Sequence, residues 1–374
     1  MLTDFAVRNY RSVRDVWLKL GPVNVIVGPN GAGKSNLYRA MYLMASTASG
    51  DFARSLAGEG GMQSAIWAGK YLSGERLRLH LSITVDNLRY DLACGKDPRR
   101  IADPRNLSFF RFDPDIKTET VIDLSGGKHK TILKRRGSHI QARSGSGELT
   151  DYLMSVASNE PVLSGLKEPH LYPQLSRLRQ ELLSWRFYHQ FRTDIDSPIR
   201  KPRVPVATPL MADDGSDLVL ALATILEMGD DELLLSSLED AFPGAELLID
   251  ETARGLRLKL QFPQFGRAFD ASELSDGTLQ YLCLLAVALS LKPPTLMAIN
   301  EPESSIHSDL FEPLARLLCQ ASHTSQVWIT THSPELVDFI LEYSGHDAIE
   351  LEKVDGETRL VGRGLGGYKY EDDV

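Results

Sequence analysis

The sequence predicts an α/β fold built on a parallel sheet, with an antiparallel β subdomain and a helical insertion. An apolar, strand-like segment at 23–27 is followed by a glycine-rich loop and then by residues with the apolar spacing of a helix. Residues 269–345 again alternate strand and helix patterns, which is typical of a parallel α/β core. Residues 75–135 instead hold short runs of alternating polarity between turn residues, a pattern that favours antiparallel hairpins.

An N-terminal lobe is expected over residues 1–135. It begins with two strands and the helix that follows the glycine-rich loop. Alternating polarity then predicts four further strands, near residues 77–85, 88–93, 120–124 and 130–133.

A mainly helical insertion is expected over residues 136–245, before a C-terminal lobe over 246–374. The Gly/Ser-rich segment at 137–147 predicts a loop, and so does the proline-containing segment at 193–216. Helical patterns fill most of the remaining insertion, at residues 148–185, 217–227 and 231–241. The C-terminal lobe starts with a predicted β-hairpin at 247–262, which turns at Arg254 and Gly255.

Composition indicates a globular protein of the cytoplasm. Hydrophobic residues make up 43% and charged residues 24% of the 374 positions, as in ordinary globular domains. No apolar run reaches the roughly 18–20 residues that span a bilayer, so no membrane partner is expected. The start of the chain shows no secretory signal pattern. The three scattered cysteines, Cys94, Cys283 and Cys319, argue against disulfides and against a zinc site.

The glycine-rich loop carries a phosphate-binding motif. Residues 28–35 match the P-loop pattern G-x-x-x-x-G-K-[ST] at every fixed position. Glycines let successive backbone N–H groups curl around phosphate oxygens, and the following helix adds positive charge from its N-terminus. Lys34 is expected to reach the β- and γ-phosphates, and Ser35 to offer its hydroxyl to Mg²⁺. A chance glycine-rich turn is the alternative, and the agreement between the motif and its flanks argues against it.

A second motif lies at the end of the apolar segment 295–299. Asn300, Glu301 and Glu303 follow directly, where a Walker B motif would bring an acidic residue beside the P-loop. Glu301 is expected to polarise the water that attacks the γ-phosphate. An ordinary buried strand would explain the apolar run but not the acidic residues that follow it.

Two further positions stand at the ends of predicted elements. Ser275 and Gly277 precede a long apolar helix at 280–291, where they predict either a second anion site or a plain helix cap. His332 follows the apolar segment 326–330 and can hydrogen-bond a γ-phosphate. A lone histidine is usually structural, but its place one strand after the acidic motif favours a functional role.

The order of these motifs resembles that of the ATP-binding-cassette (ABC) ATPase heads, in particular the RecF/SMC-like group of AAA-family ATPases. It is similar to the stand-alone predicted ATPases that are related to the overcoming-lysogenization-defect (OLD) family. The likeness covers residues 1–45 and 270–340 and rests on five strings, at 8–13, 28–36, 274–277, 301–307 and 330–333. It implies an α/β, ABC-type P-loop ATPase head with an antiparallel β subdomain and a helical insertion.

The resemblance also implies a composite site that binds ATP and Mg²⁺ between two copies of the chain, in an ATP-dependent homodimer. One copy would contribute Glu301, His332 and the phosphate-binding residues Asn30, Gly31, Gly33, Lys34, Ser35 and Asn36. Ser35 and Asn300 would face the metal, and Arg11 and Ser12 would touch the nucleotide of their own subunit. Ser275 and Gly277 of the other copy would meet the γ-phosphate.

The sequence departs from the family pattern at two of these positions. Asn300 stands where an aspartate is usual, and its neutral amide is a weaker partner for Mg²⁺. Asp276 replaces a common glycine, and we expect its carboxylate to point away from the γ-phosphate that it would repel. The residues after the head are too few for an appended nuclease domain, so none is expected.

These observations predict an ATPase that dimerises around ATP and acts on DNA or on a separate effector protein, in DNA repair, genome maintenance or antiviral (phage) defence. The alternative is a nucleotide-gated scaffold that hydrolyses ATP weakly because of Asn300. A transporter ATPase subunit fits less well, because no coupling segment is recognisable.

One basic stretch is the best candidate for contact with DNA. Residues 128–143 hold six Lys or Arg and no acidic residue, although the net charge of the whole chain is −9. A solvated basic hairpin explains the same stretch equally well. A weaker candidate is the group Arg192, Arg200, Lys201 and Arg203.

Overall fold

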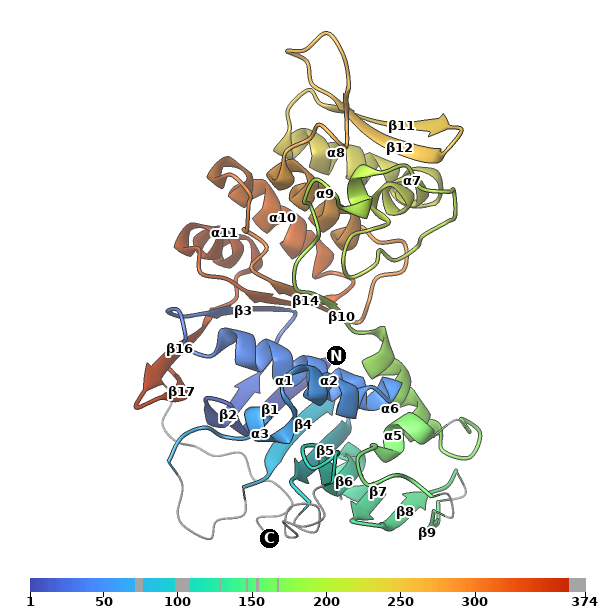
Figure 1. Ribbon diagram of the computed structural model, residues 1–374, viewed down its shortest axis with the longest axis vertical. Coiled ribbons are helices and arrows are strands. Elements are labelled where there is room, and N and C mark those ends of the chain that lie inside the picture. The colour runs from blue at the N-terminus through green and yellow to red at the C-terminus, as the bar shows by residue number, and fades with distance from the viewer. Residues whose placement is uncertain are drawn as a thin grey trace. The chain divides into compact units, whose positions relative to one another are not determined.

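The computed structural model describes residues 1–362, except 71–76, 98–107, 128, 146, 153–154 and 167. The chain forms two compact units whose segments interleave along the sequence (Figure 1). One unit is built from residues 1–21, 28–185 and the segment that begins at Ile349, and the other from residues 22–27 and 186–348. The three-part division at residues 135 and 245 follows sequence patterns instead of packing, and it remains a prediction.

The first unit contains an eight-stranded antiparallel sheet, in the order β2-β1-β4-β5-β6-β7-β8-β9. Its strands are β1 (Leu2–Tyr10), β2 (Val13–Lys19), β4 (Leu79–Val85), β5 (Leu88–Gly95), β6 (Asp115–Asp123), β7 (Lys130–Arg136), β8 (His139–Arg143) and β9 (Leu149–Asp151). Most neighbours in the sheet are also neighbours in sequence. The alternating polarity of this region is therefore the pattern of successive hairpins, as the sequence predicted.

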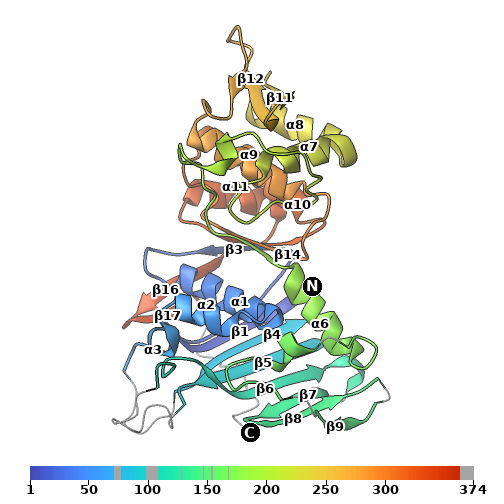
Figure 2. The ribbon, with the colours of Figure 1, turned by 45° about the vertical axis from the view of Figure 1, so that its right-hand side comes forward.

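Helices cover one face of this sheet. Figure 2 shows α1 (Lys34–Ser49) and α6 (Pro173–Ser184) side by side over the sheet, where α1 contacts β1 and β4 and α6 contacts β7. The shorter helices of the unit are α2 (Phe52–Gly58), α3 (Gly61–Ala65) and α5 (Val162–Gly165). Leu37, Met41 and Met44 of α1 are fully buried, because their helical spacing places them on the face that packs against the unit.

A C-terminal hairpin completes the first unit. It consists of β16 (Ile349–Val354) and β17 (Glu357–Leu360), joined by a turn at Asp355 and Gly356, which both have positive φ. β17 packs beside β2. The hairpin therefore joins the last described residues of the chain to its first strands.

The second unit contains a parallel sheet, in the order β10-β14-β15-β3. Its strands are β10 (Arg186–Tyr188), β14 (Leu296–Asn300), β15 (Gln326–Thr330) and β3 (Val23–Val27). All but the last residue of β14 and of β3 are buried, and β15 is buried throughout, as expected for a parallel sheet covered on both faces. The parallel core predicted for residues 269–345 is confirmed.

Helices and a small sheet surround this core. The helices are α7 (Leu218–Met228), α8 (Asp231–Ala241), α9 (Asp276–Ala288), α10 (Phe311–Ala321) and α11 (Pro334–Ser344). The strands β11 (Glu246–Thr252), β12 (Gly255–Gln261) and β13 (Phe269–Asp270) form an antiparallel sheet, which confirms the predicted hairpin at 247–262. Residues 279–288 of α9 are all buried, so this helix lies at the centre of the unit.

Two local predictions in the insertion are wrong. The segment 137–147 is not a continuous loop, because β8 occupies residues 139–143 with Ile140 and Ala142 buried in alternation. The described residues between 148 and 161 are not helical: β9 pairs with β8, and the first described helix of this region begins at Val162. Tertiary pairing outweighs local composition at both places. Among the described residues, no helix has the length and apolar character needed to cross a bilayer.

Candidate nucleotide site

The loop at residues 28–35 has the backbone that its glycines predict. Gly28, Gly31 and Gly33 have φ values of 144°, 78° and 113°, in the region that side chains disfavour. The Ala32 N–H donates to the Pro29 carbonyl at 3.1 Å, which closes the loop on itself. α1 begins at Lys34, and its N-cap Gly33 has no side chain to cap the helix. The N-terminal turn of α1 is therefore available to an anion.

The Lys34 ammonium group is held inside this loop. Its Nζ atom donates to the Gly28 carbonyl at 2.5 Å and to the Pro29 carbonyl at 3.4 Å, and the residue is only 6% exposed. Asn30, Gly31 and Ser35 are exposed on the same loop. The structure thus brings the predicted phosphate-binding residues onto one short, accessible curl of backbone with a positive charge at its centre.

The C-terminal hairpin fits closely around this loop. A Cβ atom on Gly33 would lie 2.2 Å from Oγ1 of Thr358, and one on Gly28 would lie 2.3 Å from the Leu351 carbonyl oxygen. Thr358 is fully buried, and its Oγ1 lies 2.8 Å from Oγ of Ser12. Nδ2 of Asn36 donates to the same Ser12 oxygen at 2.8 Å. Thr358 therefore completes a hydroxyl and amide network beneath the loop, and no motif in the sequence indicated it.

Arg11 is bound to an acidic residue of its own unit. Its Nε and Nη2 atoms donate to Oε2 of Glu59 at 3.2 and 3.0 Å, and the Tyr10 hydroxyl donates to the same oxygen at 2.5 Å. Burial, together with this carboxylate, raises the pKa of Tyr10 far above its usual value. Arg11 also has a positive φ of 49°, a strained conformation for a side chain of its size. The sequence did not indicate Glu59.

The acidic motif after β14 is tied to the end of β15. Oδ1 of Asn300 accepts a hydrogen bond from the Thr330 hydroxyl at 2.8 Å, and the Glu301 N–H donates to the Thr330 carbonyl at 2.7 Å. Glu301 has a φ of 49°, so its backbone is strained at the point where the strand ends. Strain of this kind persists only where surrounding contacts fix the chain, and here the contacts come from β15.

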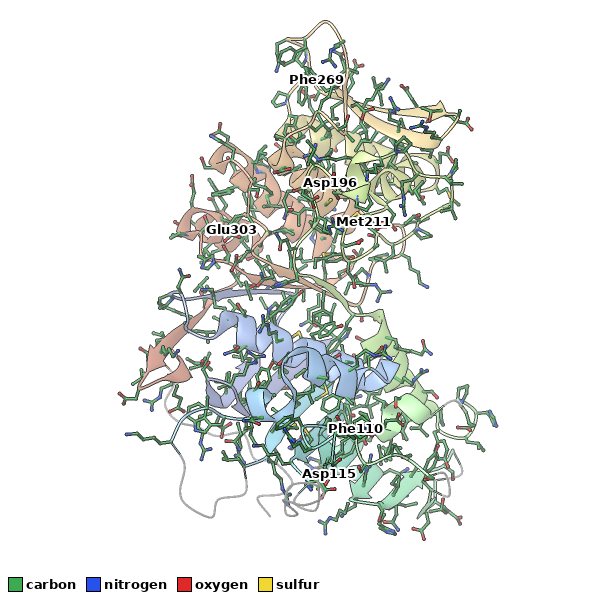
Figure 3. The ribbon with its side chains drawn as sticks, in the orientation of Figure 1. Phe110, Asp115, Asp196, Met211, Phe269 and Glu303 are labelled. Carbon is green, nitrogen blue, oxygen red and sulfur yellow. The ribbon has the colours of Figure 1, made fainter. Side chains whose placement is uncertain are left out.

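Glu301 and His332 form a pair at the ends of these two strands. Oε1 of Glu301 lies 2.8 Å from Nε2 of His332. Glu303, labelled in Figure 3, holds the histidine segment: its Oε1 accepts from the Thr331 hydroxyl at 2.6 Å and from the His332 N–H at 2.9 Å. Glu303 is thus a positioning residue, which the sequence showed only as part of the acidic cluster.

The parallel register places these groups at one edge of the sheet. Asn300 pairs with Thr330, and Thr330 pairs with Ile26 of β3. The carboxyl ends of the three strands therefore coincide, and the glycine-rich loop follows β3 directly along the chain. Ligands of open α/β sheets bind outside this edge.

The predicted serine and glycine lie at the start of α9. Oγ of Ser275 accepts from the Thr278 N–H at 3.1 Å, so Ser275 is the N-cap of this helix, and it is exposed. The Asp276 carboxylate binds Nη2 of Arg200 at 2.7 Å. Gly277 packs on the loop after β14, since a Cβ there would lie 2.3 Å from the Ser305 carbonyl oxygen.

The basic stretch 128–143 is largely a hairpin, β7–β8, and two of its arginines are used inside the unit. Arg135 is only 2% exposed, and its guanidinium donates to the carbonyls of Glu160, Ala157 and Gly137 at 2.6, 3.0 and 2.9 Å. Arg143 donates to the carbonyls of Thr131 and Gly147 at 2.7 and 2.5 Å. Neither is a free phosphate contact, and Lys128 lies outside the described residues.

Buried Glu119 explains why Arg135 is needed there. Its Oε2 lies 3.8 Å from Nη1 of Arg135, and its carboxylate accepts from the Tyr90 hydroxyl at 3.1 Å. It also accepts from the backbone N–H groups of Val162 and Leu163 at the start of α5, at 2.7 and 3.2 Å. Burial raises the pKa of Glu119.

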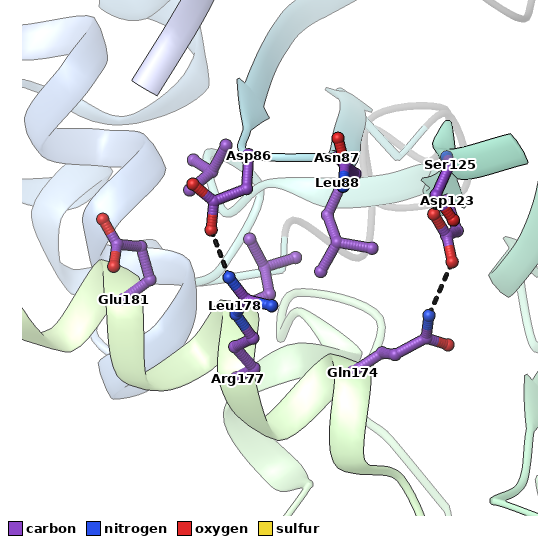
Figure 4. A pocket seen from close by; sticks show the side chains of 10 residues that line it. Asp86, Asn87, Leu88, Asp123, Ser125, Gln174, Arg177, Leu178 and Glu181 are labelled. Atoms are coloured by element: carbon purple, nitrogen blue, oxygen red, sulfur yellow. Dashed lines mark hydrogen bonds and ion pairs between the residues drawn. The ribbon is translucent and has the colours of Figure 1, made fainter. Parts of the chain in front are cut away.

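The first unit also has a cavity of about 240 Å³ between the β4–β5 turn and α6 (Figure 4). Asp86 is paired with Arg177, and Nε2 of Gln174 donates to Oδ2 of Asp123 at 2.7 Å. Three of the charged groups that line this cavity are thus occupied, Asp86 and Arg177 by each other and Asp123 by Gln174. The part of the chain that the structure describes holds no group of three or more His, Cys, Asp or Glu side chains arranged for a metal ion.

Comparison with known proteins agrees with this geometry. A family model described as "AAA domain, putative AbiEii toxin, Type IV TA system" matches residues 23–338. The chain belongs to this AAA-domain family. A segment of 44 residues is 50% identical to the OLD nuclease of Thermus scotoductus; it is 12% of this chain and 8% of that protein.

Two solved structures show the fold. One is the SMC head bound to the C-winged helix domain of ScpA, with a TM-score of 0.51, 16% identity, and 97% of this chain and 98% of that chain covered. The other is the Pyrococcus furiosus SMC head domain bound to the C-terminal domain of ScpA, with a TM-score of 0.50, 13% identity, and 96% and 95% covered. The chain therefore has the fold of an ABC-type P-loop ATPase head, as the sequence predicted, and its similarity to the OLD nuclease is confined to the 44-residue segment.

Proposed function

We propose that this protein binds ATP, hydrolyses it slowly, and closes two of its copies around the nucleotide. The observation that carries the proposal is the sheet edge where three consecutive parallel strands end: β14, followed by Glu301, β15, followed by His332, and β3, which leads into the glycine-rich loop. A phosphate-binding loop and an acidic residue that follow strands of the same parallel sheet are the two parts that hydrolysis of a nucleoside triphosphate requires.

The loop would hold the triphosphate. The backbone from Asn30 to Gly33, with Asn36 beneath it, would surround the phosphates, and the ammonium of Lys34 would exchange two neutral carbonyls for phosphate oxygens. Ser12 would act through Asn36, to which it is hydrogen-bonded. Arg11 would reach the nucleotide only after loosening its contact with Glu59.

The residues present offer Mg²⁺ two neutral oxygen ligands. When bound, Mg²⁺ would neutralise part of the negative charge on the phosphates. Ser35 and the amide oxygen of Asn300 are the side chains that would face it, and Asn300 keeps one lone pair beyond its bond from Thr330. A site without a carboxylate cage suits Mg²⁺, which keeps several waters and binds mainly through substrate phosphates.

Glu301 would accept the proton of the attacking water. The new bond forms between the water oxygen and the γ-phosphorus, and the bond to the bridging oxygen breaks, releasing ADP and phosphate. Glu301 and His332 share a hydrogen bond, so the imidazole would hold the carboxylate toward the water and contact the γ-phosphate.

The signature residues would act on the nucleotide of a second copy. Ser275 is exposed at the start of α9, where a helix N-terminus favours an anion. Gly277 lies against the loop that follows Glu301. Within one copy, the turn that would contact the partner's nucleotide is therefore packed on the loop that carries the acidic residue for the copy's own nucleotide. This arrangement supports an ATP-dependent homodimer.

The output of the cycle would fall on DNA or on a separate effector protein, in genome maintenance or phage defence within the cytoplasm. For DNA, the structure leaves Lys130, Lys134 and Arg136 at least partly exposed on the β7–β8 hairpin. The competing function is a nucleotide-gated scaffold with little turnover, and it is favoured by the neutral Asn300 beside Glu301.

The test is the oligomeric state of the Glu301→Gln variant with ATP and Mg²⁺. The amide cannot accept the water's proton, so ATP should stay bound and sedimentation should show the dimer. With ADP in place of ATP, the variant should remain monomeric. A variant that remains monomeric with saturating ATP contradicts the composite site. Wild-type protein that binds ATP without turnover at any Mg²⁺ concentration favours the scaffold.

A further inference from the structure

Arg200 connects two loops of the second unit through all three nitrogens of its guanidinium. Its Nε donates to the carbonyls of Thr193 and Asp194 at 2.9 and 3.2 Å. The other two nitrogens bind the turn before α9. Their acceptors are the carbonyls of Ala271, Ser272 and Leu274, at 3.0, 3.3 and 2.8 Å, and Oδ1 of Asp276, at 2.7 Å.

These contacts bracket Ser275. Leu274 precedes it and Asp276 follows it, and both are bound to the same planar group. The Arg200 side chain is 8% exposed, whereas that of Asp276 is 56% exposed. Arg200 is itself anchored, because Ser197 accepts from the Ile199 N–H at 3.3 Å and Ile199 is buried. The guanidinium thus lies behind the turn, and Ser275 remains open to solvent.

We propose that Arg200 is a positioning residue that fixes Ser275 and the first turn of α9 for contact with ATP bound by a second copy of the chain. The inference rests on the proposed function. A guanidinium presents its donors in a rigid plane, so one side chain can hold several carbonyls of a turn in one arrangement. Without it, the carbonyls of Ala271, Ser272 and Leu274 would lose the side chain that holds them together.

The ion pair with Arg200 also offsets the negative charge of Asp276. A carboxylate beside a γ-phosphate repels it, and here the carboxylate is paired with Arg200. Arg200 therefore has two separable effects, on the shape of the turn and on its charge. A lysine at this position keeps the charge but has no planar fork, which allows the two effects to be told apart.

The experiment measures the dissociation constant of the ATP-bound dimer in the Glu301→Gln background. Adding Arg200→Met or Arg200→Lys should raise it about tenfold or more, the equivalent of about 1.4 kcal/mol. ATP affinity of the separate monomer should stay unchanged, which a general loss of folding would not allow. If Arg200→Met fails to fold, Arg200→Lys, which retains the stem and charge, carries the test.

Arg267→Met is the matched control. Arg267 binds Glu273 of the same turn at 2.7 and 2.9 Å, but through an exposed side-chain pair that should contribute little. The ATP-bound dimer of the Arg267→Met, Glu301→Gln protein should have the same dissociation constant as that of Glu301→Gln alone.

Three outcomes would overturn the inference. The first is a dimer that Arg200→Lys leaves unchanged, and the second is full recovery of Arg200→Met by Asp276→Asn, which would mean that only charge matters. The third is failure of Glu301→Gln alone to dimerise, which would overturn the proposed function as well. In the first two cases the proposed function stands.

Discussion

Oε1 of Glu301 lies 2.8 Å from Nε2 of His332, although the two residues belong to different strands and loops. Two features hold this pair: the strained backbone of Glu301, with a φ of 49°, and the bonds from Glu303 to the histidine segment. The pair is therefore held by contacts within the protein itself. Its first consequence concerns the chemical step.

Replacing His332 by Ala should lower kcat about 10²-fold or more while ATP affinity changes little. The imidazole orients Glu301 and meets charge that develops on the γ-phosphate, and removing one such donor typically costs this much. Steady-state ATPase assays and equilibrium binding of ATP measure the two quantities. His323→Ala, at an exposed histidine in the turn between α10 and β15, is the control. A His332→Ala protein with normal kcat would remove the imidazole from the reaction.

Replacing Lys34 by Ala should abolish detectable ATP binding or weaken it greatly. The substitution removes the single charge held by the carbonyls of Gly28 and Pro29 at the centre of the loop. Calorimetric titration with ATP gives the affinity. Lys353→Ala, on an exposed position of β16, should bind as the parent does. Parent-like affinity in Lys34→Ala would show that nucleotide binds elsewhere.

Thr358→Val should weaken ATP binding several-fold, and Thr358→Ser should largely preserve it. Valine keeps the volume but removes the hydroxyl that contacts Ser12, and a hydrogen bond of this kind contributes about 1 kcal/mol. Because Ser12 in turn accepts from Asn36, the loss is transmitted to the first turn of α1. The readout is the ATP dissociation constant of all three proteins. Equal affinities for the Val and Ser variants would limit Thr358 to a packing role.

Asn300→Asp should lower the Mg²⁺ concentration needed for half-maximal ATPase activity. The aspartate can still accept the bond from Thr330, so the local geometry should survive. Two unit charges 4 Å apart interact by about 4 kcal/mol at an effective dielectric of ~20, and a divalent ion doubles this, before desolvation offsets part of it. A Mg²⁺ titration of both proteins decides the matter. An unchanged requirement would place Asn300 away from the ion.

Neutralising Lys134 and Arg136 should weaken binding to duplex DNA and reduce the log–log salt slope by about two units, if the hairpin contacts phosphates.

Arg135→Met should instead lower thermal stability, because it leaves buried Glu119 without its cation; breaking a buried pair costs about 3–5 kcal/mol. DNA titrations over a salt series and thermal unfolding separate these effects. An unchanged slope would leave the hairpin a solvated surface.

The sequence predicted correctly those features that depend on a short, continuous stretch of residues. The glycine-rich loop, the strand before Glu301 and the strand before His332 each combine a local pattern with a local motif, and the structure places all of them where parallel strands end. The hairpin at 247–262 was likewise visible from its turn and its alternation.

What the sequence did not show depends on residues brought together by the fold. Glu59 and Thr358 have no motif, and Arg200 was singled out only as part of a weak basic group for DNA, whereas its side chain is 8% exposed and holds the turn before α9. Their partners lie far away in the chain: Thr358 contacts Ser12, and Arg200 contacts Asp276. Arg135 was misleading for the same reason, since a basic run does not reveal which of its side chains points inward to a buried carboxylate. β8 was missed because glycine and serine around it outweighed the two buried apolar residues in the pattern.

The pairing of β3 with β15 has a consequence for how the protein is made. Val23 pairs with Val327, so the strand that leads into the nucleotide loop is synthesised about 300 residues before the strand with which it pairs. Leu351 and Thr358, which enclose the loop, arrive later still. A nascent chain would therefore carry an apolar strand without a partner throughout elongation, which is a hazard for aggregation. On the proposed function, the chain would bind ATP only after Leu351 and Thr358, which enclose the loop, have been synthesised.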